Sequence, residues 1–525
     1  MPVTGLSRRR RPLFSAIGLS AIIAGSLLYI LPEFIVPRHR SPVAASDSPQ
    51  LCLSSGNASH RTCGDEPAAG VWTAFLLQAA GRALMGFSSI SVYSLAVAYL
   101  GDVAGPKRSS NYLGECLGDP DDEMFVSVYG DFVIGIYFSA SAVGPALGIL
   151  LSSEFLKLPT DLGKGSETVA PDANTTGAWW LISVVGSALA FILMPLVALL
   201  PDKHTDAAES RSFIQGLKTI VTDPVKATLL LAGSIDSLLP LIVLSYSFKL
   251  LEILFPDLSY ATYIIAGVVV PLGGAGFPIG GFVTRRLSTR GVIKFCMIAA
   301  LVTSALFPGM LVHCSETAPF AGMDTRRTDS SNNLNATCNS DCTCSRDLYQ
   351  PVCGETQISY FSPCHAGCTE SGIRGFLNCA CVGRNGTATP GECSVAGACP
   401  AWKLPVAATF YALLAVGLTI TKSPSTVVLM RLTEEEFKTV TVAISETGKL
   451  LTVLGVIPAV GALIDRSCLL WTTDCGTTGS CLRYQPGTVA RDFVLINVGL
   501  KALSCLCYLL TLVLYRGEPS EILAA

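Results

Sequence analysis

Between residues 338 and 399 the chain reads CNSDCTCSRDLYQPVCGETQISYFSPCHAGCTESGIRGFLNCACVGRNGTATPGECSVAGAC. A polar segment of this length buries too little apolar surface to be stable alone. An even number of closely spaced cysteines therefore favours a framework of disulfides on the oxidising side of a membrane. The spacing leaves the pairing open. The cysteines are Cys338, Cys342, Cys344, Cys353, Cys364, Cys368, Cys379, Cys381, Cys393 and Cys399.

Zinc binding is the alternative use of these cysteines, because Cys342 with Cys344 and Cys379 with Cys381 form close pairs. Two N-glycosylation sequons, at Asn335 and Asn385, lie beside and within the same segment. Such sequons are used in exported loops, where cysteines oxidise. The segment therefore predicts disulfides and no metal site.

The chain as a whole is too apolar for a soluble protein. Of its 525 residues, 50% are hydrophobic and 14% are charged, and the mean hydropathy is +0.51. Soluble domains carry about 25% charged residues, so lipid must solvate most of this chain. The sequence has no basic domain for nucleic acid and no G-x-x-x-x-G-K-[ST] loop for a nucleotide. It also lacks a catalytic triad and a cofactor motif, so we do not expect an enzyme or a cofactor.

Apolar runs of spanning length predict ten transmembrane helices. The first run follows four arginines and is too long for a signal peptide. A segment at 213–221 has amphipathic spacing suited to the membrane surface, and Lys422 and Arg431 are expected in a loop. The spans cover about 13–36, 72–100, 126–151, 177–200, 227–246 and 263–284, then one that ends near 313, and finally 402–420, 440–464 and 493–515.

Loop composition predicts which side of the membrane each loop faces. Lysines and arginines are concentrated in one set of short loops, as expected for the cytoplasmic side. The sequons at Asn57, Asn174, Asn335 and Asn385 all fall in the other set. We therefore expect a multi-pass protein of the cell membrane with both termini in the cytoplasm. In the first outer loop, a disulfide between Cys52 and Cys63 is expected.

The cysteine-rich segment resembles a Kazal-type domain through 351–354 (PVCG), Tyr360 and 362–368 (SPCHAGC). A Kazal-like domain between two membrane spans resembles the organic anion transporting polypeptides. The similarity extends over nearly the whole chain, through 99–102 (YLGD), 177–180 (GAWW), 248–252 (FKLLE) and 463–471 (LIDRSCLLW).

This resemblance implies an all-α polytopic membrane protein with the helix bundle of the major facilitator superfamily, plus a small disulfide-rich extracellular domain. Family members have twelve helices in two halves, and the first span here matches their third, so we expect this sequence to be without the first helical hairpin of the family. The resemblance implies sodium-independent transport of amphipathic organic anions, such as steroid conjugates, bile salts or thyroid hormones, by alternating access. Small organic anions and the lipid bilayer are then the partners.

The expected organisation has six parts. Residues 1–200 form the amino-terminal membrane half, and 201–226 form a cytoplasmic linker. The carboxy-terminal membrane half comprises 227–313 and 404–515. It is interrupted by the Kazal-like domain at 314–403 and followed by a cytoplasmic tail at 516–525.

Ionisable side chains within spans cost about 2.5 to 3.5 kcal/mol each at a helix centre, so each needs a partner or a watery cavity. By resemblance, Arg82, Lys249 and Lys449 are the candidates for binding an anionic substrate. The alternative is that Arg82 and Lys449 are held in buried pairs by Asp131, Asp236 or Glu446. Lys501 is a further charged residue within a span.

Three structural expectations remain. The Gly144-Pro145 and Pro271 regions, both rich in glycine, permit either broken helices or close helix packing. His365 is expected at the surface of the cysteine-rich domain. Two functional alternatives also stay open: a non-transporting membrane protein whose Kazal-like domain binds a protease or another partner, and an inactive truncated isoform.

Overall fold

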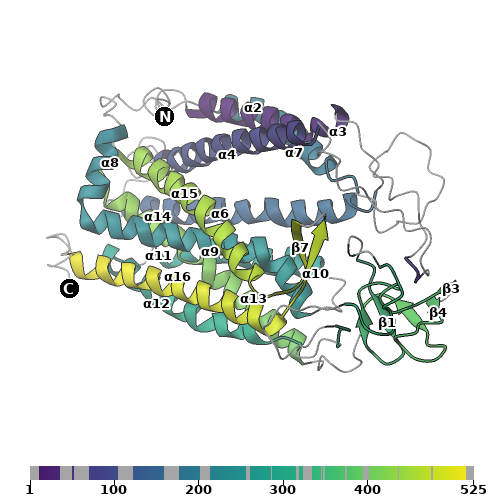
Figure 1. Ribbon diagram of the computed structural model, residues 1–525. Coiled ribbons are helices and arrows are strands. Elements are labelled where there is room, and N and C mark those ends of the chain that lie inside the picture. Colours follow the sequence, from purple (N-terminus) through teal and green to yellow (C-terminus); the bar gives the residue numbers. More distant parts are fainter. Residues whose placement is uncertain are drawn as a thin grey trace.

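The computed structural model is a helix bundle with a small sheet domain at one end (Figure 1). This architecture confirms the expected fold class. The structure describes residues 11–35, 50–52, 70–103, 122–158, 177–200, 213–255, 261–284, 287–314, 319–322, 334–344, 346, 349–372, 375–393, 400, 402–434, 437–474 and 477–515.

The first helix group contains α2, α4, α6 and α7. Helix α2 packs between α4 and α7, and glycine allows α2 and α4 to approach closely. A Cβ atom on Gly81 would lie 2.6 Å from the carbonyl oxygen of Gly25, a distance that no side chain tolerates. The elements are α2 (Arg11–Ile30), α3 (Pro32–Ile35), α4 (Gly70–Val103), α6 (Asp122–Phe155) and α7 (Leu181–Ala198).

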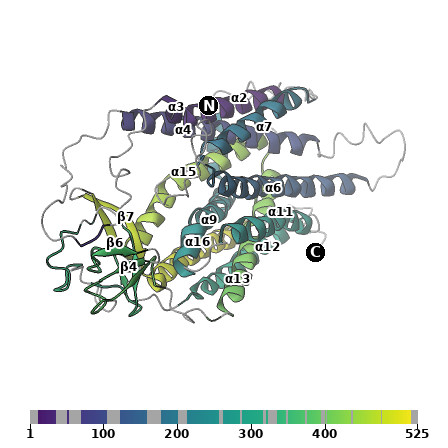
Figure 2. The same ribbon diagram turned by 90° about the vertical axis from the view of Figure 1, so that its right-hand side faces the viewer.

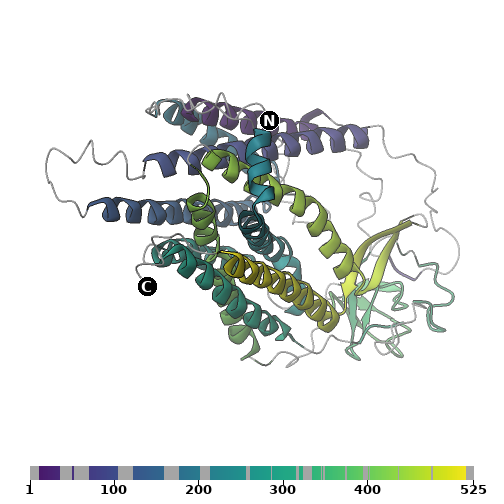
Figure 3. The ribbon, with the colours of Figure 1, turned by 90° about the vertical axis from the view of Figure 1, so that its left-hand side faces the viewer.

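The second helix group contains α9 and the helices from α11 to α16, with the short α8 at its edge. Figures 2 and 3 show two layers, with α6 of the first group and α15 of the second at the contact between them. Helix α6 packs mainly against α11 of the second group. The elements are α8 (Phe213–Thr222), α9 (Pro224–Leu254), α10 (Ala261–Ile264), η2 (Ile265–Val269), α11 (Val270–Thr284), α12 (Thr289–Leu306), η3 (Phe307–Leu311), α13 (Lys403–Thr419), α14 (Lys422–Arg431), α15 (Lys438–Asp465) and α16 (Pro486–Leu514).

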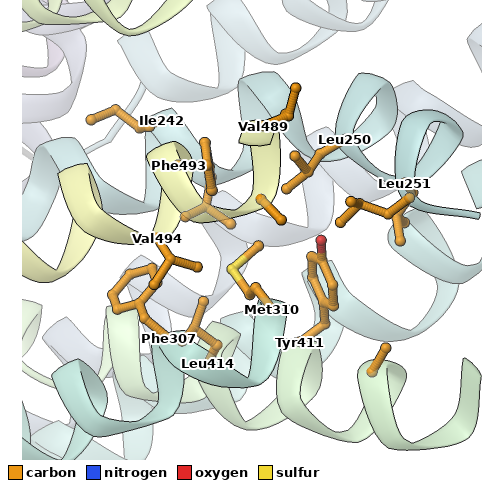
Figure 4. Packing of buried hydrophobic residues seen from close by; sticks show 14 of the residues in the cluster. Ile242, Leu250, Leu251, Phe307, Met310, Tyr411, Leu414, Val489, Phe493 and Val494 are labelled. Carbon is orange, nitrogen blue, oxygen red and sulfur yellow. The ribbon is translucent and has the colours of Figure 1, made fainter. Parts of the chain in front are cut away.

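The largest apolar core lies within the second helix group. Figure 4 shows Ile242 of α9, Phe307 of η3, Leu414 of α13 and Phe493 of α16 pointing toward one another. All four side chains are buried. Removing such side chains from water supplies about 1.5 to 3 kcal/mol each in a soluble protein, whereas in lipid the gain comes mainly from close packing.

Eight helices among the described residues are long and apolar enough to cross a membrane. They cover Pro12–Ile35, Tyr137–Phe155, Leu181–Ala198, Pro224–Leu254, Ile265–Thr284, Thr289–Leu311, Lys403–Arg431 and Pro486–Leu514. The other two predicted spans correspond to the long helices α4 and α15. On α7, Phe191, Ile192 and Leu196 are at least half exposed, as expected for side chains that face lipid.

The structure corrects one local expectation, the loop position of Lys422, and refines two others. Helix α6 continues through Pro145 without a break. Lys422 lies in the bundle and not in a loop, because α14 extends the eighth predicted span to Arg431. The expected amphipathic helix α8 does form, but its Ile220 packs against Val440 and Ile444 of α15.

The glycines that follow Pro271 serve close helix packing. A Cβ atom on Gly276 would lie 2.7 Å from the carbonyl oxygen of Val416, and one on Gly280 would lie 2.2 Å from that of Ile420. These contacts place α11 directly against the end of α13. The π-helical segment η2, just before Pro271, is the irregular part of this span.

The cysteine-rich domain contains a five-stranded sheet in the order β2-β1-β5-β4-β3. The strands are β1 (Val352–Gly354), β2 (Ser359–Tyr360), β3 (Glu370–Gly372), β4 (Gly375–Leu377) and β5 (Ala388–Pro390). Four disulfides hold the domain together internally: Cys338–Cys381, Cys344–Cys364, Cys353–Cys393 and Cys368–Cys379. Cys399 lies outside the described residues.

The expected disulfide between Cys52 and Cys63 was wrong. Cys52 is bonded to Cys342, so the first outer loop is joined covalently to the cysteine-rich domain. The backbone NH of Cys52 also donates to the carbonyl of Cys368 at 2.8 Å. Cys314, at the end of the seventh predicted span, is disulfide-bonded as well.

A hairpin between α15 and α16 packs on the same domain. Its strands, β6 (Cys468–Asp474) and β7 (Thr477–Tyr484), are bridged by the Cys468–Cys481 disulfide. Leu470 is buried with Phe361, and the guanidinium carbon of Arg483 lies 5.0 Å from the ring centroid of Phe320. Figure 1 shows the start of α2 and the end of α16 at the opposite end of the bundle.

Candidate functional site

A cavity of about 210 Å³ lies between the ends of α9, α15 and α16 and strand β7. Its walls are mostly apolar, and Lys249 is the basic residue among them. The Nζ atom of Lys249 lies 3.2 Å from Oε2 of Glu252 and 5.8 Å from the ring centroid of Tyr484. The cavity is lined by Tyr246, Lys249, Leu250, Ile253, Gly461, Ile464, Asp465, Tyr484 and Val489.

The polar side chains of this cavity are held in place by hydrogen bonds. Tyr484 donates from its hydroxyl to Oδ1 of Asp465 at 2.9 Å, and Tyr246 donates to the carbonyl of Ile457 at 2.6 Å. Burial, together with the bond to Asp465, raises the pKa of Tyr484 to about 12, so its hydroxyl remains a donor at neutral pH. The cavity thus combines an apolar wall with one ammonium group and one hydrogen-bonded carboxylate.

Arg82 lies elsewhere in the bundle, on the side of α4 that faces α2. Its guanidinium carbon is 4.0 Å from the ring centroid of Tyr29, close enough for a cation–π interaction. The Tyr29 ring in turn meets Trp179 edge to face at 5.5 Å. Arg82 does not line the Lys249 cavity, so the structure does not bring these two predicted contacts together.

A buried ion pair joins α9 to α16. Nζ of Lys501 lies 2.8 Å from Oδ1 of Asp236, and both side chains have no exposed surface. Ser504 donates to the same oxygen at 2.6 Å, and Tyr508 donates to Oδ2 at 2.9 Å. Among the described side chains, Asp236 therefore pairs with Lys501, whereas Arg82 lies over Tyr29. Such a fully bonded carboxylate suits a structural role.

Three predicted residues lie on described helices, but the structure does not describe their side chains. Asp131 is on α6, and Glu446 and Lys449 are on α15. Their roles stay predictions. Among the predicted glycosylation sites, Asn335 and Asn385 are exposed, whereas Asn57 and Asn174 lie outside the described residues.

Lys422 was predicted in a loop, but it lies in the helix bundle. It begins α14, is half-buried, and its Nζ lies 3.1 Å from the hydroxyl oxygen of Ser237 on α9. The same nitrogen is 5.6 Å from the ring centroid of Phe138 on α6. Lys422 therefore touches both helix groups. The available signal was the apolar run at 427–429, which shows that the span continues beyond the polar residues at 421–426.

Comparisons with known proteins agree with this architecture. A sequence model of the Organic Anion Transporter Polypeptide (OATP) family matches residues 6–117, 122–212 and 202–488. These ranges include the first helix group, the cysteine-rich domain and the second helix group up to the start of α16.

Individual relatives match along nearly the full chain. Solute carrier organic anion transporter family member 4A1 of Mus musculus is 26% identical over 97% of this chain and 73% of its own length. Family member 4C1 of Homo sapiens is 26% identical over 98% and 73%, and member 1B1 of Homo sapiens is 25% identical over 98% and 82%. With membrane-spanning helices, a disulfide-rich sheet domain and a family match over most of its length, this chain belongs to the Organic Anion Transporter Polypeptide family.

Proposed function

We propose that this protein carries amphipathic organic anions, such as steroid conjugates, bile salts or thyroid hormones, across the cell membrane independently of sodium. In this proposal both termini are cytoplasmic and the cysteine-rich domain is extracellular. The two helix groups rock against each other, so that a site between them faces each side of the membrane in turn. Family membership supports organic anion transport in general, and the specific substrates are our inference.

The cavity beside Lys249 is the observation that carries this proposal. It opens at the end of the bundle that bears the cysteine-rich domain, and it offers an ammonium group next to apolar walls. Its volume, about 210 Å³, is below the roughly 300 to 1,000 Å³ of typical small-molecule pockets. It therefore suits part of an amphipathic anion, with the acidic group at Lys249 and an apolar edge against Leu250 and Val489.

Lys249, Arg82 and Lys449 are the proposed substrate contacts. Because Arg82 and Lys249 lie apart, we propose that they act at different stages of the transport cycle. Arg82 has a planar guanidinium that stacks on Tyr29 and pairs well with carboxylate or sulfate. Lys249 presents a compact charge at the outer entrance.

Uptake of a radiolabelled sulfated steroid tests the proposal. Cells that express the chain should take up the label saturably, and replacing extracellular sodium with choline should leave the rate unchanged. The full-length protein must be present at the surface, as measured by biotinylation. Surface-expressed protein with no uptake above that of untransfected cells, for a sulfated steroid, a bile salt and a thyroid hormone, would contradict it.

A further inference from the structure

We propose that Lys422 binds the acidic group of the transported anion, at the contact between the two helix groups. This inference rests on the proposed function and adds a specific residue and ligand geometry to it. The sequence resemblance does not single out Lys422, whereas its position in the bundle does.

Lys422 lies beside an aromatic cluster that both helix groups build. We call Tyr93, Tyr137, Phe138 and Phe277 the contact cluster. Tyr93 comes from α4, Tyr137 and Phe138 come from α6, and Phe277 comes from α11. Ring centroids are 5.7 Å apart between Tyr93 and Phe138, and 5.9 Å apart between Phe138 and Phe277. Any relative rocking of the two groups must rearrange these contacts.

The chemistry of this place fits a flat apolar anion. Aromatic faces pack against a fused-ring skeleton through dispersion and offset stacking. An ammonium group adjacent to them receives a sulfate or carboxylate through a charge-assisted hydrogen bond, which is about twice as strong as a neutral one. Lys422 supplies that ammonium next to Phe138, the most buried ring of the contact cluster.

A polar junction between two helices lies directly before Lys422. Helix α13 ends and α14 begins around Ile420 and Thr421, where the backbone keeps helical φ and ψ angles. Ser423 is buried there, and its hydroxyl oxygen has no hydrogen-bond partner among the described residues. Buried hydroxyls rarely remain in that state, so a ligand or water in this region would satisfy it.

Lys422 is not the cation of the Asp236 ion pair. Asp236 precedes Ser237, the hydrogen-bond partner of Lys422, but its Oδ1 is bonded to Lys501 and Ser504, and its Oδ2 to Tyr508. The lysine that neutralises Asp236 is thus Lys501. Lys422 instead reaches past this pair toward α6 of the other helix group.

Transport kinetics of two lysine variants test the assignment. Lys422→Gln should raise KM for a sulfated steroid about tenfold, the loss expected for one hydrogen bond to a charged group. Lys422→Arg should keep KM within about threefold, because the charge remains. Lys403→Gln is the matched control, since Lys403 lies on the same span and donates to the carbonyl of His313 at 3.0 Å. It should leave KM unchanged.

A ligand comparison separates charge recognition from general damage. In purified full-length protein, the sulfated steroid at one fixed, subsaturating concentration should raise the thermal unfolding temperature of the wild type and of Lys403→Gln clearly more than that of Lys422→Gln. The same steroid without its sulfate should affect wild type and Lys422→Gln alike. If Lys422 had only a structural role, its substitution would change the temperature shifts caused by both ligands equally. That outcome would overturn the proposal.

A measurement on the wild type covers the case in which Lys422→Gln fails to fold. Sulfated steroid should slow acylation of Lys422 by an amine-reactive reagent, read by mass spectrometry, and leave Lys403 unaffected. Unchanged labelling of Lys422 would overturn the inference. If the wild type transports but Lys422→Gln keeps a normal KM, only the inference fails. If the wild type neither binds nor transports any of the anions tested, the proposed function fails with it.

Discussion

Cys52 and Cys342 form a disulfide although they are 290 positions apart in the sequence. Cys52 follows the first predicted span, and Cys342 belongs to the cysteine-rich domain that interrupts the second helix group. Leu51, beside this disulfide, packs against the sheet core formed by Val352 and its neighbours. The domain is therefore attached to both helix groups: by chain continuity to the second and by this disulfide to the first.

We predict that this bond keeps a cleaved chain together. A protease site inserted within 64–69 separates Cys52 from Cys342 on cleavage. The two fragments should migrate together without reductant and apart with it. Because the site lies after Cys63, a Cys52–Cys63 bond would let the fragments separate without reductant, and that result would contradict the structure. The double variant Cys52→Ala with Cys63→Ala is the control and should separate under both conditions.

His365 makes the cysteine-rich domain sensitive to acid. Contrary to the expectation of a surface position, it is buried, and its Nδ1 lies 2.8 Å from the hydroxyl of Ser362. Its Nε2 is buried and has no hydrogen-bond partner among the described residues. Burial, with a smaller contribution from the charge of Arg346, lowers the pKa of His365 to about 4. The folded domain thus holds this ring neutral.

The direction of the pH effect follows from linkage. An unfolded histidine has a pKa of about 6.5, so between about pH 6.5 and 4 the unfolded state binds more protons than the folded state. Stability is complete above this window and is lost as the pH falls through it, by about 1 to 3 kcal/mol. His365→Asn should flatten this dependence. Hydrogen exchange of domain peptides in the full-length protein, corrected for intrinsic rates at each pH, measures how the stability of the domain depends on pH. An equal dependence in wild type and variant would rule out a contribution from His365.

The helices could be predicted from the sequence because a membrane span has a recognisable local pattern. A lipid-exposed helix such as α7 needs a continuous apolar run of spanning length, and no tertiary contact is required to recognise it. Helix α14 shows the limit. Its first residues, Lys422 to Thr426, are mostly polar, as in a loop. Packing inside the bundle nevertheless buries Ser423 and Ser425, and the helix continues to Arg431.

Pairings between distant residues could not be predicted in the same way. Asp236 and Lys501 are 265 positions apart and meet only because α9 packs on α16. Their charges were visible in the sequence, but nothing in the local pattern selects Lys501 over Lys449. The same holds for Cys52 and Cys342, since cysteine spacing gives many equivalent pairings. By contrast, Lys249 and Glu252 are neighbours in the sequence, and the structure pairs them on one turn of α9.

Substitution of the proposed substrate contacts should lower uptake. Arg82→Ala and Lys449→Ala should each reduce uptake of a sulfated steroid at least about tenfold, because each removes a charge-assisted contact. Lys157→Ala is a control, since Lys157 is exposed and pairs with Glu154 at 2.8 Å. It should retain normal uptake. Unchanged uptake by either test variant, at equal surface abundance, would remove that residue from the site.

The Asp236–Lys501 pair should matter for stability, and the pattern of variants should reveal its nature. Lys501→Met leaves the Asp236 carboxylate buried without its cation, which costs about 3 to 5 kcal/mol. The double variant Asp236→Leu with Lys501→Met removes both charges, and replacing a buried pair by apolar side chains is often nearly neutral. We expect thermal unfolding of the purified full-length protein to show the single variant far less stable than the double variant. Tyr508→Phe, which removes one donor to Asp236, should fall between them, with a loss of about 1 to 3 kcal/mol. If the double variant were instead the least stable of the three, the pair would contribute more through specific geometry than through charge neutralisation.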